Sequence, residues 1–216
     1  MPEDGVPIIA TRIALLELRD EHRLVQEGYE LLDEKRMMLA AEILRELRRH
    51  GELERARLEH EREARTAYGA AVEAHGFEDL TTEPRLGLEG ALLRRERRLF
   101  LGIGLVEAAL EAGEPTFNAA PILPSPELRR CALAYRHLVA DHAALAAIAT
   151  NLRRLVREYV RTERRARALE NVLLPEIDAS LRFVEEQLDA VDQEEAVRVR
   201  NAARSGAAPE AGHGST

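Results

Sequence analysis

The sequence predicts a mainly α fold, in which two long helices form an antiparallel coiled-coil hairpin around a short middle segment. The first observation is the placing of proline. None lies between Ile8 and Glu83, and only Pro175 interrupts the stretch 127–208. Five of the nine prolines fall within 84–126. The proline-poor arms are rich in Ala, Leu, Glu and Arg, which propagate helices. An unbroken helix of about 60–65 residues would run roughly 90–100 Å.

These boundaries divide the 216 residues into four expected segments. We expect an N-terminal shaft helix over 11–76 and an irregular middle over 77–126. A C-terminal shaft helix over 127–203, bent near residue 175, should follow, and then a disordered tail over 204–216. The middle contains Leu99-Phe100-Leu101-Gly102-Ile103-Gly104-Leu105-Val106. Two interpretations of this stretch remain open: two short strands around a turn, or a short helix broken by glycines.

Composition is the second observation, and it also excludes several classes of function. Aromatic residues make up 4% of the chain, Trp is absent and 32% of residues are charged. This is typical of an elongated coiled coil, whose seam is one stripe wide on each helix. The net charge of −8 argues against a general nucleic-acid binder. No apolar run suits a membrane span and no secretory signal opens the chain, so we expect a cytoplasmic protein without direct membrane insertion.

Heptad spacing is the third observation. In the first arm we expect Thr11 to be the N-cap, and apolar pairs recur every seven residues. The seam, meaning the stripe of residues that packs between the two helices, is assigned here to the first member of each pair. The predicted residues are Leu24, Leu31 and Met38.

The second arm has a clearer a/d pattern, which then changes phase. Its first register comprises Leu138, Leu145, Ile148, Leu152, Leu155, Leu169 and Leu173. The later register comprises Ile177, Leu181, Val184 and Leu188. Pro175 lies at the change of phase, where a missing backbone donor should bend the helix.

No catalytic, metal or cofactor site is predicted. Histidines inside the arms lack the Glu-x-x-His spacing of helical di-iron proteins, and no Walker-type glycine loop occurs. Charge is nevertheless uneven along the second arm. The stretch 151–167 has seven Arg against two Glu, whereas 170–195 has nine acidic residues against one Arg. Such bands are either solvated faces or surfaces for partners.

Two separated blocks resemble a known family. The first contains Ala10-Thr11-Arg12 and then Gly28-Tyr29-Glu30-Leu31-Leu32-Asp33-Glu34-Lys35-Arg36-Met37-Met38-Leu39. The second is Arg164-Arg165-Ala166-Arg167-Ala168-Leu169-Glu170-Asn171-Val172-Leu173-Leu174-Pro175. Together they resemble the D subunits of the V-type and archaeal-type rotary ATPases. Ala10 stands where that family has proline, and Arg167 where it has asparagine.

The resemblance implies a non-catalytic central rotor shaft that transmits torque. Its implied partners are the catalytic-head subunits A and B, the small F subunit of the central stalk, and the funnel-like C/d subunit above the membrane ring. The chain would then be peripheral to the membrane as part of a membrane-bound complex. The residues expected at the shaft bend or facing the head are Lys35, Arg36, Arg164, Arg165, Glu170 and Pro175. The alternative is a coiled-coil adaptor without motor function; a helical-bundle enzyme is disfavoured by the missing Glu-x-x-His spacing.

Overall fold

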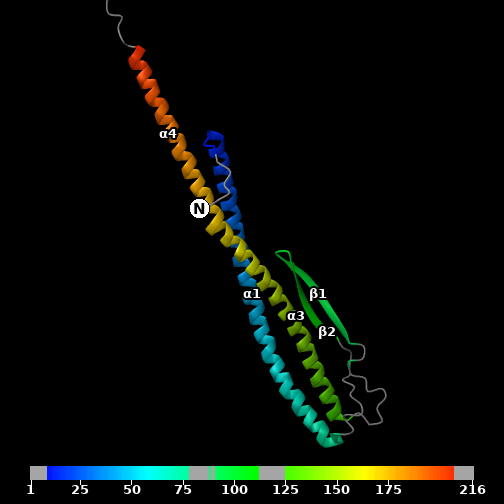
Figure 1. Cartoon of the computed structure of the whole chain (residues 1–216). Coiled ribbons are helices and arrows are strands. Elements are labelled where there is room, and N and C mark those ends of the chain that lie inside the picture. The colour runs from blue at the N-terminus through cyan, green and yellow to red at the C-terminus, as the bar shows by residue number, and fades with distance from the viewer. Residues whose placement is uncertain (1–8, 78–87, 89–90, 112–124, 207–216) are drawn as a thin grey trace, which may run out of the picture. The chain divides into compact units, whose positions relative to one another are not determined.

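The computed structural model describes residues 9–77, 88, 91–111 and 125–206, with side chains up to residue 203. The elements, in chain order, are α1 (Arg12–His75), β1 (Leu92–Phe100), β2 (Ile103–Glu111), α3 (Pro126–Ala168), the π-helical turn η1 (Leu169–Leu173) and α4 (Leu174–Gly206) (Figure 1). The fold is therefore mainly α with long paired helices, as predicted. The open question about the middle is also answered, because the stretch around Gly102 is a β-hairpin. Most of the predicted disordered tail, 207–216, lies outside the described residues.

The described residues form two compact units. Unit 1 holds those within Met1–Glu34 and Glu163–Thr216, and unit 2 holds those within Lys35–Thr162. Ion pairs show the antiparallel course of the helices in unit 1, where α1 and α4 are joined by Arg19–Glu185 at 2.8 Å and Arg12–Asp192 at 3.4 Å. None of the helices in the described part of the chain is both long and apolar enough to cross a bilayer.

Local sequence explains where α1 begins and ends and where α3 begins. The Thr11 hydroxyl accepts a hydrogen bond from the Ala14 N–H at 3.1 Å, which satisfies a free donor of the first turn of α1. At the other end Gly76 has a φ of 81°, and its N–H bonds to the Val72 carbonyl. Ser125 caps α3 through the Leu128 N–H, and its Oγ lies 2.6 Å from Nε2 of His75.

The β-hairpin has a tight two-residue turn. Leu101 and Gly102 have φ values of 49° and 82°, which are the left-handed conformations of a type I′ turn. Glycine at 102 removes the steric cost of that conformation. From the turn, nine antiparallel pairs run without a bulge from Phe100↔Ile103 to Leu92↔Glu111.

The core of unit 2 joins the hairpin to both helices. Leu39 of α1, Leu105 of β2 and Leu155 of α3 are fully buried against one another. Further along, the buried residues are mostly alanines, with Ala64, Ala67 and Ala71 on α1. Small side chains at these positions allow the two helix backbones to approach closely. Each large apolar side chain that is buried, such as those of the three leucines, contributes about 1.5–3 kcal/mol to the stability of the fold.

The change of phase in the second arm coincides with the π-helical turn. Buried Ile148, Leu155 and Thr162 follow a seven-residue step, and Ile177 and Val184 resume that step one residue out of phase. A π-turn supplies that additional residue. Within it the Leu174 N–H bonds to the Leu169 carbonyl, five residues back. Because Pro175 has no N–H and its ring would crowd the preceding turn, the wider turn also relieves the proline.

The predicted seam of the first arm was wrong by one residue. Leu24 and Leu31 are 69% and 68% exposed, and Met38 is also exposed. The second member of each pair is more buried: Val25 and Leu32 are half-buried and Leu39 is fully buried. Adjacent apolar residues on a helix lie about 100° apart, so the pairs alone did not distinguish the buried member.

Candidate functional site

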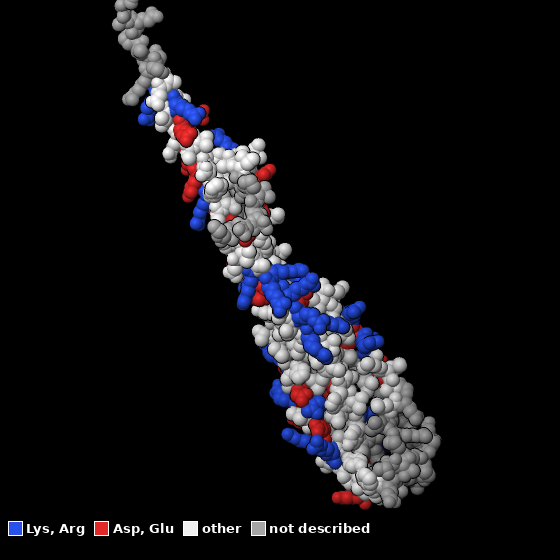
Figure 2. Space-filling view, in the orientation of Figure 1, with Lys and Arg blue, Asp and Glu red and all other residues white. Residues whose placement is uncertain are grey.

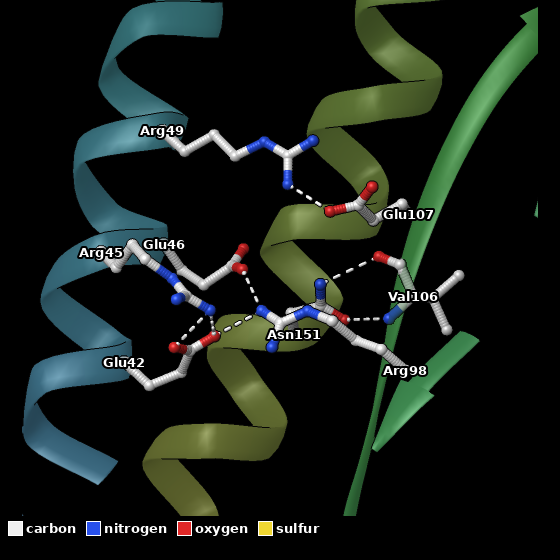
Figure 3. A network of polar contacts seen from close by, with 8 residues as sticks. All are labelled: Glu42, Arg45, Glu46, Arg49, Arg98, Val106, Glu107 and Asn151. Carbon is white, nitrogen blue, oxygen red and sulfur yellow. Dashed lines mark hydrogen bonds and ion pairs between the residues drawn. The ribbon is translucent and has the colours of Figure 1, made fainter. Parts of the chain in front are cut away.

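A buried polar network fastens the β-hairpin of unit 2 to α1. Glu42 and Glu46, one helical turn apart on α1, are only 3% and 2% exposed. The guanidinium of Arg98 on β1 contacts both carboxylates, with Nη2 donating to Glu42 Oε1 and, at 3.1 Å, to Glu46 Oε1 (Figure 3). Arg45 adds a second ion pair to Glu42 at 2.6 Å. The hydrogen bond to Glu42 is the main cause that raises the pKa of Arg98, so the guanidinium stays charged.

A further ion pair joins β2 to α1 at the edge of this network. Arg49 Nη1 donates to Glu107 Oε1 at 2.6 Å (Figure 3). That hydrogen bond and the charge of Arg49 lower the pKa of the Glu107 carboxyl. Both side chains are about half exposed, so we expect this pair to contribute less than the buried one.

On α3, the side-chain amide of Asn151 forms two hydrogen bonds with the backbone of β2, as the backbone of a neighbouring strand would. Its Oδ1 accepts from the Val106 N–H at 2.8 Å, and its Nδ2 donates to the Val106 carbonyl at 2.9 Å (Figure 3). Asn151 is 2% exposed. Nearby, Arg154 Nη1 donates to the Gly104 carbonyl at 2.5 Å. The hairpin is therefore bonded to α1 by charge and to α3 by side-chain–backbone hydrogen bonds.

Farther along unit 2 the two helices are joined by a histidine–carboxylate pair. Nδ1 of His60 on α1 lies 2.6 Å from Oδ2 of Asp141 on α3. The hydrogen bond to Asp141 is the largest cause that raises the pKa of His60, against the opposing effect of desolvation. The rings of His60 and His137 lie 5.6 Å apart. The described residues contain no group of three His, Cys, Asp or Glu side chains suited to a metal ion.

A small cavity of about 280 Å³ lies beside this pair. It is lined by Arg57, Glu61, Ala64, Arg65, Tyr135, Leu138 and His142. Its arginines form ion pairs with carboxylates of α1, since Arg57 bonds to Glu54 and Glu61 and Arg65 bonds to Glu61. These ion pairs join residues three or four positions apart on α1, so they support the helix itself.

Comparison with known proteins gives a consistent result over most of the chain. The family model that describes the D subunits of ATP synthases matches residues 14–204. The chain belongs to the ATP synthase D-subunit family. It is 29% identical over 195 residues to the V-type ATP synthase D subunit of Thermus thermophilus, covering 88% of this chain and 85% of the relative. It is 26% identical over 200 residues to the A-type ATP synthase D subunit of Methanopyrus kandleri, covering 88% and 83%.

The predicted seam residues of the second arm of this family member fall into three states of burial. Leu145, Ile148, Leu155, Ile177 and Val184 are buried. Leu138, Leu152, Leu169, Leu181 and Leu188 are half-buried. Leu173, the last residue of the predicted first register, is 37% exposed. It lies at the end of the π-turn, where the heptad phase has already shifted.

The predicted head-facing residues are divided between the two units. In unit 2, Lys35 pairs with Glu158 at 2.7 Å, and both side chains are mostly buried. In unit 1, Arg164 and Arg165 are exposed near the end of α3, Glu170 is exposed within the π-turn, and Pro175 is exposed in the first turn of α4. Arg36 is half-buried on α1.

Sequence reasoning missed the network around Arg98. Its members lie more than 50 positions apart, because Arg98 contacts Glu42 and Glu46 with separations of 56 and 52 residues. The one local signal was the cluster of four arginines within Leu92–Phe100. That cluster indicates a charged strand, but it does not identify the partners of each arginine.

Proposed function

We propose that this chain is the non-catalytic central-stalk component of a V/A-type ATPase or ATP synthase, and that it transmits torque between a catalytic head and a membrane ion ring. Family membership over residues 14–204 supports the assignment to such a complex. The observation that carries the mechanical part is α1, which continues for 64 residues from Arg12 to His75 without a break. A helix of that length spans roughly 96 Å.

The use of polar groups in unit 2 supports a mechanical role. Glu42, Glu46, Arg98 and Asn151 are engaged in bonds that hold the hairpin to the helices. Such bonds stiffen a structure and fix the position of the hairpin on the helices. A coiled-coil adaptor would explain paired helices, but it does not account for the family match along the whole length of both arms.

The partners follow from the proposed role. We expect nucleotide-binding subunits A and B around the paired helices, the small F subunit beside them, and the funnel-like C/d subunit toward the membrane ring. The complex would hold this chain peripheral to the membrane. Affinity purification of the tagged full chain from solubilised membranes of its own cells should recover A, B and F. Recovery of none of the nucleotide-binding subunits would contradict the proposal.

Pro175 provides a sharper test of torque transmission. We expect that Pro175→Ala, in the assembled complex, lowers the number of ions transported per ATP hydrolysed, because the substitution restores a backbone donor beside the π-turn. Val172→Ala is the matched control, since Val172 is a half-exposed residue within the same turn. An unchanged ratio in Pro175→Ala would remove the proline from the mechanism and leave the family assignment intact.

A further inference from the structure

The two edges of the β-hairpin differ in how their backbone groups are satisfied. The outer edge of β2 is covered by α3, because Asn151 bonds to both backbone groups of Val106 and Arg154 bonds to the Gly104 carbonyl. Val106 therefore directs its N–H and carbonyl away from β1. This leaves β1 to form the opposite edge of the two-stranded sheet.

The register shows which groups of β1 point outward. Val106 is opposite Arg97, and Phe100 and Ile103 close the two-residue turn as a hydrogen-bonded pair. Arg97 then belongs to a pair without mutual bonds, so its N–H and carbonyl point away from β2, as do those of Leu93, Arg95 and Leu99. Among the described residues, none of these backbone groups has a hydrogen-bond partner. This edge, defined by residues 93, 95, 97 and 99, is called the β1 edge below.

The side chains of the β1 edge share one face of the hairpin, and they are exposed. Leu93 and Leu99 are 52% and 78% exposed. Arg95 and Arg97 are exposed, and neither forms an ion pair within the described part of the chain. The arginines of the other face are paired instead, Arg94 with Glu111 and Arg98 with Glu42. Figure 2 shows basic side chains gathered over this part of unit 2.

The length of β1 makes this arrangement unusual for an edge strand. Exposed edges are normally kept short, bulged or interrupted by proline, because they attract other strands. β1 has nine residues, no proline and a continuous register. Within the described part of the chain, what protects this edge is positive charge. Positive charge repels a second copy of β1 while it attracts a carboxylate-bearing strand. Arginine is suited to that role because its fork binds carboxylates in a bidentate manner.

We propose that the β1 edge binds an extended acidic segment of another protein, which adds to the hairpin as a third strand. Main-chain hydrogen bonds to residues 93, 95, 97 and 99 would supply general affinity. Arg95 and Arg97 would select carboxylates at alternate positions of the incoming strand, and Leu93 and Leu99 would cover its apolar residues. This inference is independent of the rotor proposal, since it rests only on the hairpin of unit 2.

The test uses the full chain and a capped synthetic peptide of alternating Glu and Val. A Lys/Val peptide of the same length serves as the control peptide. Titration calorimetry should detect the acidic peptide and not the basic one. Arg95→Glu combined with Arg97→Glu should weaken binding at least about tenfold, because attraction becomes repulsion at two positions. Arg129→Glu combined with Arg130→Glu is the matched control. It makes the same change in charge at two exposed sites at the start of α3, and it should leave affinity unchanged.

Residue-resolved hydrogen exchange distinguishes strand addition from simple charge attraction. The bound peptide should slow exchange at the amides of 93, 95, 97 and 99. Binding without that protection, or equal loss of affinity in both double variants, would overturn the proposal. So would strong protection of these amides in the free chain, which would mean that a segment of the chain itself occupies the edge. Protection that appears with rising protein concentration alone would indicate a second copy, and it would overturn the proposal as well.

Discussion

Arg98 is the residue on which the docking of the hairpin to α1 depends most. It contacts two carboxylates that are almost fully buried, and removal of one partner from such a group leaves uncompensated charge. We expect Arg98→Met to lower the free energy of unfolding by about 2–3 kcal/mol, although Arg45 still pairs with Glu42. Urea denaturation of the full chain measures this change.

Arg94→Met is the matched control for Arg98→Met. Arg94 lies on the same strand, and its partner Glu111 is exposed. Exposed pairs contribute little to stability, so the control should lose much less than Arg98→Met. Equal losses in the two variants would show that burial of Glu42 and Glu46 does not govern the effect.

His60 makes part of the stability of unit 2 depend on pH. Its hydrogen bond with Asp141 chiefly raises its pKa above the ordinary 6.5, and Glu59 and Glu63 on its own helix act in the same direction. A raised pKa means that the stabilisation is fully present below the unfolded value, and that it declines as the pH rises through the folded value. From α3, the ring of His137 also lies beside the His60 ring, in addition to the Asp141 carboxylate.

Asp141→Asn should therefore cost more stability at about pH 6 than at about pH 9. Because solvent screens this pair in part, the difference should stay below about 1 kcal/mol. Urea denaturation of both proteins at the two pH values measures it. His142→Gln is the control, because Nδ1 of His142 donates to the Leu138 carbonyl of its own helix. A larger cost at the higher pH would reverse the sign and contradict the assignment to His60.

At the scale of elements, Asn151 is the link between the hairpin and α3. It supplies both an acceptor and a donor to Val106 from a buried position, so Asn151→Ala leaves two backbone groups without partners. We expect a loss of about 2–4 kcal/mol and faster hydrogen exchange in β2. Thr150→Ala is the control, since the Thr150 hydroxyl donates to the Ala146 carbonyl of its own helix. Unchanged exchange at Val106 in Asn151→Ala would show that the hairpin is held without this residue.

The elements themselves could largely be predicted from the sequence, because they depend on local signals. The absence of proline and the heptads predicted both helices, and the Thr11 cap predicted the start of α1. The change of phase at Pro175 was visible in the heptads, and the structure adds that a π-turn accommodates it. The pairs Leu24/Val25 and Leu31/Leu32 misled the seam assignment, because the buried member depends on the path of the facing helix. The Arg98 and Asn151 contacts could not be predicted, since they join residues that only tertiary structure brings together.

For the whole molecule, the central consequence is that α1 must remain continuous if it carries torque. Arg48 lies in the middle of α1, is exposed, and bonds through Nε to the Leu44 carbonyl of its own helix. Proline at this position removes a backbone hydrogen bond and strains the preceding turn, at a cost of about 3 kcal/mol. We expect Arg48→Pro, in an assembled complex, to preserve ATP hydrolysis better than ion transport, so that the ratio of ions moved to ATP consumed falls.

Two variants make that outcome interpretable. Arg48→Ala removes the same side chain and keeps the helix, so its ratio should match the parent. Gly51→Ala acts in the opposite direction: a Cβ there meets nothing within 4 Å, and alanine favours helix by about 1 kcal/mol. It should raise thermal stability while it maintains the ratio. The measurement combines ATPase rate with ion uptake in vesicles, after co-purification has shown that each variant assembles. A normal ratio in an assembled Arg48→Pro complex would mean that torque does not pass through this part of α1, because a helix interrupted there could no longer act as a continuous stiff element.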